Sequence, residues 1–406
     1  MSRPRLLFVS RAMPWPLHGG ARIRDYNMLQ ALCAEFEVDL LTVGESNARI
    51  DRLCDRIILP TRHYGDETAL LSLERWVFAC FESLKSRDPL WLTSKTNGKL
   101  RQAMRGAANS GEYAAVHASE LSSAATLVGH TKTPVVYDAH NCEWKLLARA
   151  LDKSSGAMRM VLKREVPRLR ATERSTVMGS QMLLLPSQSD LEDLEELADQ
   201  PLPNGHVMPS AIDLELYAEA RRREPEPYTI LVPGKFDWRP NAMGLEWFVK
   251  EVLPRLREKL AGTAFKVIVA GRLTEQGRSR LAEVPEIEAV RNPHDMVGYF
   301  ARATVVAVPV LVSSGTRLRM AEAMACEKPI VATTPGAAGL EPGPGRPWLT
   351  ADETEDFAQA LSDILRNDDL RHDLASDAWN RVQELDWRRM VGPLTAAYTE
   401  LLDGGK

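Results

Sequence analysis

The 406-residue sequence has few cysteines and no long apolar run. Its five cysteines are scattered singly, without CxxC or metal-type His–Cys spacing, which is typical of reduced thiols and argues against a disulfide framework or a structural zinc. Nowhere do about 18 apolar residues follow one another, and the apolar run near the N-terminus breaks early. This pattern excludes a signal peptide and a spanning helix, so we expect a cytoplasmic protein that could work at the inner face of the membrane.

An excess of basic residues is also lacking. The formal net charge is −4 and the isoelectric point is near 6.1. The chain therefore has no overall field that attracts nucleic acid, and an anionic ligand must be held by a local site. The length exceeds one ordinary hydrophobic core and fits two domains.

Short apolar runs alternate with amphipathic helical segments along both halves of the chain. Continuous apolar runs separated by helices are typical of central strands in a parallel sheet that is covered on both faces. The pattern dissolves over residues 201–227, which are rich in proline and charge, and then restarts. We expect an α/β protein with two Rossmann-like, doubly wound domains. The predicted division is a first domain over 1–200, a linker over 201–227, a second domain over 228–384, and a closing helix over 385–406 that crosses back to the first domain.

The segment 145–174 is roughly helical and rich in arginine and lysine. One interpretation is a solvated helix face. The other is a basic patch that rests on anionic lipid, where each cation near the surface contributes about 1 kcal/mol. The sequence leaves both interpretations open.

Glycine-containing loops follow three predicted strands of the second half. They are Pro233-Gly234-Lys235, Ala270-Gly271-Arg272 and the SSGTR segment at 313–317. Any one of them could be an ordinary tight turn. The last leads directly into a helix, so the amides of Gly315 and Thr316 could bind a phosphate, since glycine lets the anion approach closely. Lys235 and Arg239 could add cations from the first loop.

The carboxylate of Glu322 follows the SSGTR segment by about two helical turns. A carboxylate at this place could accept hydrogen bonds from both hydroxyls of a ribose. The alternative is a glutamate that only favours the helix. A nucleotide could bind to both, with its phosphate at the Gly315 and Thr316 amides and its ribose at the Glu322 carboxylate.

The stretch 303–340 resembles the donor-binding signature of the retaining glycosyltransferases of family four. The segments 231–256, RAMPWPLHGGARIR at 11–24, VVYDAHNCEW at 135–144 and the closing 386–402 extend the resemblance over almost the full chain. It implies a GT-B fold, in which two Rossmann-like domains face a central cleft. It also implies transfer of a sugar from a nucleotide diphosphate sugar, most readily of the UDP or GDP type, to an acceptor hydroxyl in polysaccharide or glycolipid assembly.

The resemblance also implies roles for individual residues. Glu322 would bind the ribose, the Gly315 and Thr316 amides would hold the diphosphate, and Lys235 and Arg239 would neutralise it. The other positions implied for the donor are Gly234, Arg272, Asn292, Ser314, Arg317 and Leu318. No cofactor or metal is implied, and no DxD motif ends a predicted strand.

The sequence departs from the family pattern at three positions. Lys235 stands where an arginine is usual, which loses bidentate reach. Ser314 replaces the first of two glutamates eight positions apart, and Ser119 stands where a histidine is frequent. The histidine could be replaced by His117 or His140, and with Glu120 these complete the candidates for catalysis.

In the first half, a glycine pair follows the first predicted strand and precedes a helix with two arginines. It resembles the family's loop over the diphosphate and acceptor, although any sharp turn could use such a pair. The acceptor-side candidates are His18, Gly19, Gly20, Arg24, Asn141 and Glu143. In the DAHNCE segment, a structural role for His140 stays an alternative.

The predicted function is a metal-independent, retaining hexosyltransferase that transfers to a sugar, glycolipid or small-molecule acceptor. Retention follows only from the resemblance. Two alternatives compete with it: a nucleotide-sugar epimerase, whose acidic and histidine residues differ, and a catalytically degenerate GT-B protein that acts as a nucleotide-binding partner subunit.

Overall fold

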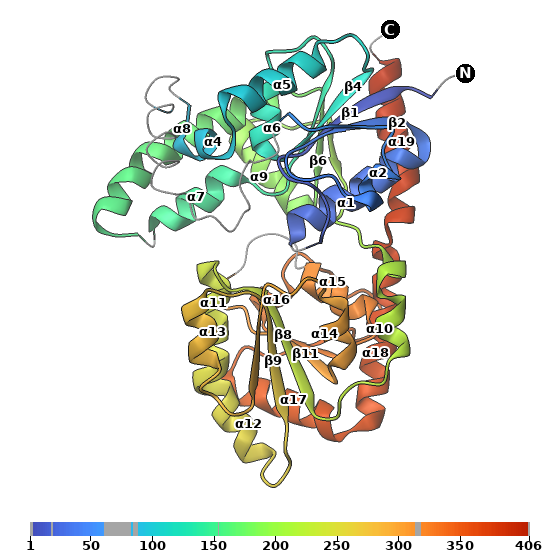
Figure 1. The fold of residues 1–406 in the computed structure, drawn as a ribbon. Coiled ribbons are helices and arrows are strands. Elements are labelled where there is room, and N and C mark those ends of the chain that lie inside the picture. The colour runs from blue at the N-terminus through green and yellow to red at the C-terminus, as the bar shows by residue number, and fades with distance from the viewer. Residues whose placement is uncertain are drawn as a thin grey trace. The chain divides into compact units, whose positions relative to one another are not determined.

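A computed structural model describes residues 3–17, 19–60, 83, 88–152, 154–312 and 318–404 (Figure 1). The chain forms two compact units. The first comprises Met1–Trp15, Asp25–Pro209 and Met390–Lys406, and the second comprises Pro16–Arg24 and Ser210–Arg389.

The first unit is built on a parallel sheet. Its described strands run in the order β3-β2-β1-β4-β5-β6-β7, so the order reverses between β1 and β4, as in doubly wound folds. The strands are β1 (Arg5–Val9), β2 (Glu37–Leu41), β3 (Arg56–Ile58), β4 (Ala115–Ser119), β5 (Val135–Asp138), β6 (Met182–Leu185) and β7 (Gly205–Val207). All pairings between neighbouring strands are parallel.

Helices cover both faces of this sheet (Figure 1). They are α1 (Gly20–Glu35), α2 (Ala48–Asp51), α4 (Leu90–Lys95), α5 (Gly98–Ala108), α6 (Glu120–Leu127), α7 (Glu143–Asp152), α8 (Gly156–Gly179), α9 (Gln188–Ala198) and α19 (Trp387–Asp403). Helix α1 begins in the second unit and α19 ends in the first.

The two faces of the first sheet are filled by alternate residues of its strands, as expected for side chains that point to opposite sides. On one face, Leu7 and Val9 pack in a cluster with Leu169 and Val177 of α8. On the other face, the ring of Phe8 stacks on His117 of β4 at 4.3 Å between centroids. The hydroxyl of Tyr398 from α19 lies 2.8 Å from Nδ1 of that histidine. Helix α19 is thereby joined to the centre of the first sheet.

The second unit contains a parallel sheet in the order β10-β9-β8-β11-β12-β13. This order reverses between β8 and β11. The strands are β8 (Thr229–Lys235), β9 (Lys266–Arg272), β10 (Ile287–Arg291), β11 (Val305–Val308), β12 (Ile330–Ala332) and β13 (Leu349–Thr350). The two doubly wound parallel sheets confirm the predicted fold class.

Helices of the second unit pack on both faces of its sheet. They are η1 (Leu214–Tyr217), α10 (Ala218–Arg222), α11 (Arg239–Trp247), the π-helical segment η2 (Phe248–Val252), α12 (Leu253–Lys259), α13 (Glu275–Leu281), α14 (Val297–Arg302), α15 (Leu318–Ala325), α16 (Thr334–Ala337), α17 (Thr354–Arg366), α18 (Asp368–Val382) and η3 (Gln383–Leu385). Leu231 and Ile268 belong to the cluster on one face, and Ile230 and Val267 to the cluster on the other.

The segment 201–227, predicted as a linker, is more ordered than its composition indicates. It contains β7, which is the edge strand of the first sheet, together with η1 and α10. The division between the units falls between Pro209 and Ser210. Because β7 has three residues and pairs on one side only, it lacks the long apolar run that marks a central strand.

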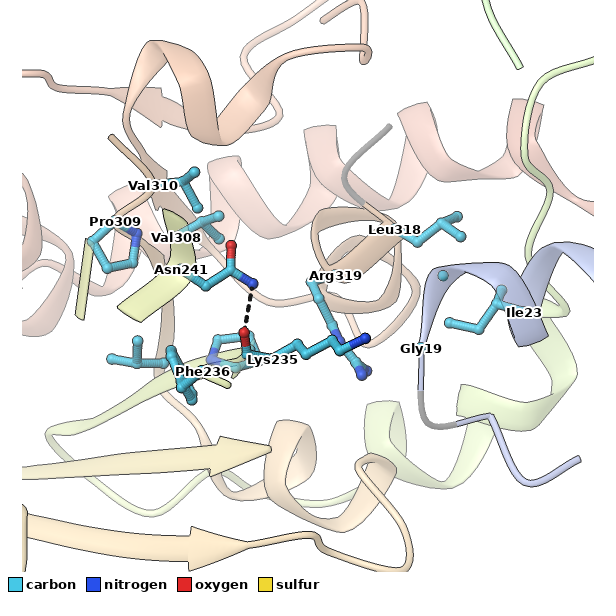
Figure 2. A pocket seen from close by; sticks show the side chains of 14 residues that line it. Gly19, Ile23, Lys235, Phe236, Asn241, Val308, Pro309, Val310, Leu318 and Arg319 are labelled. Carbon is cyan, nitrogen blue, oxygen red and sulfur yellow. Dashed lines mark hydrogen bonds between the residues drawn. The ribbon is translucent and has the colours of Figure 1, made fainter. Parts of the chain in front are cut away.

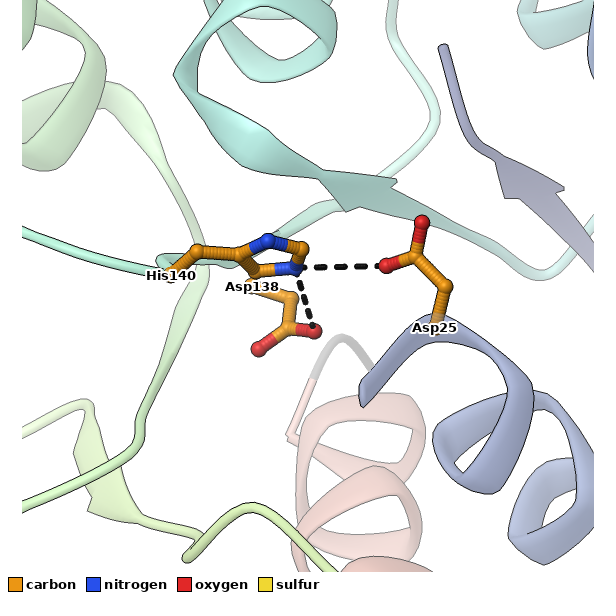
Figure 3. A group of neighbouring side chains, drawn as sticks. All are labelled: Asp25, Asp138 and His140. Atoms are coloured by element: carbon orange, nitrogen blue, oxygen red, sulfur yellow. Dashed lines mark ion pairs between the residues drawn. The ribbon is translucent and has the colours of Figure 1, made fainter. Parts of the chain in front are cut away.

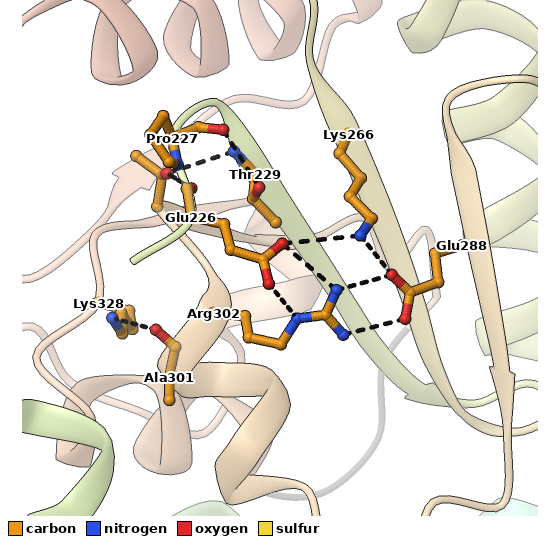
Figure 4. Close-up of polar contacts among 9 residues, drawn as sticks. Glu226, Pro227, Thr229, Lys266, Glu288, Ala301, Arg302 and Lys328 are labelled. Carbon is orange, nitrogen blue, oxygen red and sulfur yellow. Dashed lines mark hydrogen bonds and ion pairs between the residues drawn. The ribbon is translucent and has the colours of Figure 1, made fainter. Parts of the chain in front are cut away.

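An ion-pair network joins elements at one edge of the second unit (Figure 4). Arg302, at the end of α14, bonds to the carboxylates of Glu226 and Glu288, and Lys266 pairs with the same two glutamates. Hydrogen bonds to Arg302 are the main cause that lowers the pKa of Glu288 to about 2. The network connects the entry to β8 with β9, β10 and α14.

Candidate functional site

A pocket lies where the strand order of the second sheet reverses (Figure 2). Parallel sheets bind ligands beyond the carboxyl ends of their strands at such a point. Its volume is about 160 Å³, and about 10–15 Å³ on this measure holds one water molecule, so a phosphate-sized group fits. The lining combines the ends of β8 and β11 with α1 and α15. Its described residues are Gly19, Gly20, Ile23, Val232, Pro233, Gly234, Lys235, Phe236, Asn241, Val308, Pro309, Val310, Leu318 and Arg319.

Glycines make the β8 end of this pocket possible. Gly234 on β8 pairs with Gly271 on β9, and Gly271 has φ +146°, a conformation that other residues rarely adopt. A Cβ on Gly271 would lie 1.8 Å from the carbonyl oxygen of Gly234. The two glycines therefore allow the strand ends beside the pocket to approach closely.

Among the described residues that line the pocket, two side chains are cationic. Lys235 is exposed at the end of β8, and its carbonyl accepts a hydrogen bond of 3.1 Å from Nδ2 of Asn241 on α11. Arg319, in the first turn of α15, is the second cation. Figure 2 shows both long side chains reaching into the same space. This combination of two cations and a glycine-rich backbone is suited to an anion such as a phosphate group.

Of the other predicted donor residues, Arg239, Arg272 and Asn292 are not part of the pocket lining. Arg239 is exposed at the start of α11. Arg272 pairs with Asp237 at 2.7 Å, and the N–H of Asn292 donates to the Gly271 carbonyl at 2.8 Å. Leu318 lines the pocket. Ser314, Gly315, Thr316, Arg317 and His18 lie outside the described residues.

Glu322 is buried in α15, with 2% of its surface exposed. One carboxylate oxygen accepts a bond of 3.1 Å from the Tyr217 hydroxyl, and the other accepts one of 2.6 Å from Arg319. Burial raises the pKa of Glu322, while Arg319 and Tyr217 act in the opposite direction. A carboxylate offers about four acceptor positions, and these bonds occupy two of them. Arg319 thus connects Glu322 with the pocket wall.

The glycine pair leads directly into α1. Gly19 and Gly20 line the pocket, and a Cβ on Gly20 would lie 3.5 Å from Leu318. Arg24, one turn along the helix, is buried, with its guanidinium 3.3 Å from the Ser210 hydroxyl. The arginine therefore anchors the helix within the second unit.

A second polar site lies in the first unit, where its strand order reverses between β1 and β4. The Asp25 carboxylate accepts a hydrogen bond of 2.7 Å from Ser10, which follows β1, and one of 2.5 Å from Ser119, which ends β4. All three side chains are buried. Asp25 therefore bridges the two strand ends at which a doubly wound sheet binds its ligand.

His140, which follows β5, lies between two carboxylates (Figure 3). Its Nε2 is 3.2 Å from Asp25 and 3.7 Å from Asp138. Burial lowers the pKa of His140, but the two carboxylates outweigh burial and raise it to about 10. The imidazole is therefore protonated at neutral pH. Its Nδ1 has no hydrogen-bond partner among the described residues.

Asp25, Asp138 and His140 could hold a metal ion by ligand type. Their ligand atoms lie within 4.8 Å of one another, and the structure describes no second such group of three in the parts of the chain that it covers. The proton on His140 already supplies positive charge to both carboxylates. In the structure, both carboxylates make ion pairs with the ring of His140.

The remaining first-unit candidates differ in their surroundings. Glu120 has φ 63° and pairs with Arg11 at 3.1 Å and Lys95 at 3.9 Å. These cations outweigh burial and lower its pKa. His117 is wholly buried within β4 and contacts Tyr398, so its surroundings are those of a core residue.

Asn141 and Glu143 lie between β5 and α7. Both are partly exposed. The backbone N–H groups of Glu143 and Trp144 donate to the two carboxylate oxygens of Glu173 at 2.8 and 2.7 Å. Glu173 belongs to α8 and thereby holds the first turn of α7, which leads away from the His140 loop.

Residues 227–367 match the family model of the glycosyl transferases group 1. This stretch belongs to that family. The D-inositol 3-phosphate glycosyltransferase of Corynebacterium jeikeium (strain K411) is 24% identical over 264 residues, covering 60% of this chain and 62% of the relative. The chain thus spans about three fifths of the length of this relative.

Solved structures share the fold of this chain over nearly its full length. Sucrose-phosphate synthase from Thermosynechococcus elongatus is 17% identical with a TM-score of 0.69 and covers 99% of this chain and 100% of its own. Anabaena HepE, in complex with UDP and glucose, is 14% identical with a TM-score of 0.63 and covers 98% and 99%. The predicted family resemblance and GT-B fold are confirmed.

Four residues of these two sites were not predicted from the sequence. They are Asp25, Asp138, Asn241 and Arg319. Asp138 was visible in the DAHNCE segment, and Arg319 stands three residues before Glu322, the spacing of neighbours on one helix face. Asp25 lies one to two turns after the glycine pair. Asp25 could have been found among the polar residues in the first turns of the helices that follow the two strands beside the reversal point.

Proposed function

We propose that the protein is a glycosyltransferase that transfers a sugar from a nucleotide diphosphate sugar to an acceptor hydroxyl. The main support is the pocket at the reversal point of the second sheet, lined by Lys235 and Arg319, because most of it is formed within the segment that matches the family model. Anabaena HepE, which shares the fold, forms a complex with UDP and glucose, and UDP-glucose is accordingly the first donor to test.

The leaving nucleotide diphosphate develops negative charge as the bond to the sugar breaks. Lys235 and Arg319 would stabilise this charge, together with backbone N–H groups at the glycine loops. Glu322, held by Tyr217 and Arg319, would accept hydrogen bonds from the ribose. These groups provide the positive charge that a metal would otherwise supply, so we propose a metal-independent reaction.

We further propose that the anomeric configuration is retained. The acceptor hydroxyl would attack C1 from the face of the leaving group, and a β-phosphate oxygen would take its proton. On the acceptor side, His140 Nδ1, Asn141 and Glu143 would bind hydroxyl groups. A sugar, a glycolipid or a small molecule could provide them.

Two experiments test the function. In the first, the melting temperature is measured with UDP-, GDP-, ADP- and TDP-sugars, since only a ligand that binds the folded state raises it. In the second, release of nucleotide diphosphate from the matched donor is followed with EDTA present. Lys235→Ala is expected to lower kcat/KM, and the matched control is Lys250→Ala, another exposed lysine of the second unit.

The outcomes separate an enzyme from a binding protein. Turnover in EDTA that depends on Lys235 supports the proposal. Stabilisation by a nucleotide sugar without transfer or hydrolysis would instead support a nucleotide-binding subunit. Proton NMR of the product distinguishes retention from inversion.

A further inference from the structure

The first nine residues of α8 form an exposed helix end. From Gly156 to Arg164 no residue is buried, whereas Glu165 and Leu169 are buried against the first unit. At 1.5 Å per residue this end is about 13 Å long. Figure 1 shows the junction of α7 and α8 at the outer end of the first unit.

Apolar side chains are exposed on this helix end in an unusual concentration. Met160 is 75% exposed, Met158 56% and Val161 36%. At 100° per residue, Met158 and Val161 lie about 60° apart around the helix axis and Met160 lies about 100° from Val161, so the three side chains span about 160°. A fluid medium that surrounds the helix end could cover all three.

The same helix end, 156–164, carries three cations and no acidic residue. The segment 145–174 holds nine Lys and Arg against three Asp and Glu, a net charge of +6 in a chain of net −4. Two of the three acids, Glu165 and Glu173, are buried and accept bonds from backbone N–H groups. Arg159, Lys163 and Arg164 are exposed beside the apolar side chains. This charge is complementary to an anionic surface.

We propose that the start of α8 inserts into the headgroup region of an anionic membrane, with Met158, Met160 and Val161 below the phosphates and Arg159, Lys163 and Arg164 at their level. Interfacial helices bury their apolar side chains to a depth of about 5–10 Å. The exposed end of α8 is longer than this depth. Among the described helices, none combines the length and apolar character needed to cross a bilayer. The contact is therefore peripheral.

Vesicle sedimentation of the full chain tests the proposal. The protein is mixed with phosphatidylcholine vesicles, with or without 30% phosphatidylglycerol, at about 0.1 M salt. We expect binding only with the anionic lipid. Lys163→Gln/Arg164→Gln is expected to weaken it about 30-fold, which corresponds to about 1 kcal/mol for each cation. Met158→Ser/Met160→Ser is expected to weaken it at least tenfold.

Each variant has a matched control. Met178→Ser changes a methionine that is 43% exposed near the other end of the same helix. Lys250→Gln/Arg255→Gln removes two exposed cations of the second unit. Both controls are expected to bind within twofold of the wild type, and circular dichroism checks that every variant is folded.

Three results would overturn the proposal. They are equal binding to neutral and anionic vesicles, unchanged binding of the methionine variant, and a wild-type dimer in light scattering that Met158→Ser/Met160→Ser converts to a monomer without any vesicle binding. The last result would assign the helix end to contact between two copies of the chain.

Discussion

Asp25 Oδ1 lies 3.2 Å from Nε2 of His140, although 115 positions separate the two residues in the chain. The helix after β1 and the loop after β5 bring them together at the reversal point of the first sheet. The carboxylate of Asp25 stabilises the protonated form of the buried His140.

The first prediction concerns pH and His140. Its folded-state pKa of about 10 exceeds the ordinary value of about 6.5, so its stabilising contribution is complete below pH 6.5 and is lost as the pH rises through 10. The melting temperature of the wild type should therefore fall more steeply between pH 8.5 and 10.5 than that of His140→Gln. In Asp138→Asn the loss should begin at lower pH. Equal pH profiles for the wild type and His140→Gln would contradict the assignment.

The second prediction concerns donor binding by Glu322. Glu322→Ala should weaken donor binding by about 1–3 kcal/mol, because ribose hydroxyls lose their acceptor in a closed site. Isothermal titration with the donor found by thermal shift measures the change. Tyr217→Phe removes only one bond to this carboxylate and serves as the comparison, with a smaller effect expected. An unchanged dissociation constant in Glu322→Ala would exclude the ribose role.

The third prediction concerns the approach of α11 to the pocket wall. A Cβ on Gly244 would lie 1.7 Å from the Pro309 carbonyl oxygen, so Gly244→Ala must displace α11 and should cost about 1–3 kcal/mol of stability. Gly106→Ala, in α5 with no atom within 4 Å of the new Cβ, should instead stabilise by up to about 1 kcal/mol. Urea unfolding measures both. A neutral Gly244→Ala would show that the helix position is not fixed by this contact.

The fourth prediction concerns the end of α15. Glu327 follows this helix with φ 53°, a left-handed conformation that is unfavourable for a residue with a Cβ. Glu327→Gly should raise the free energy of unfolding by about 0.5–1 kcal/mol. Glu327→Ala removes the 3.7 Å pair with Arg221 but keeps the Cβ, so it should not stabilise. Equal gains from both variants would assign the effect to charge.

The domain type could be predicted because central parallel strands are continuous apolar runs. The same property limited the prediction of the sites. Both faces of β4 are buried, so alternation along the strand could not show that His117 faces Tyr398 in the core while Ser119 reaches Asp25 at the strand end. Asp25 depends on partners 15 and 94 positions away, and no local pattern encodes such contacts. Lys235 and Glu322, by contrast, stand in loop and helix motifs that are local in sequence.

The bonds from the first two N–H groups of α7 to Glu173 have a mechanical consequence. Because a buried carboxylate of α8 clamps the start of α7, the two helices form a stiff arm that continues from the loop carrying His140. Such an arm would fix the orientation of the first unit as well as attach it. If its outer end is immersed in a bilayer, the tilt of the first sheet against the membrane plane depends on how α7 is held on α8, and Glu173 contributes two hydrogen bonds to that contact.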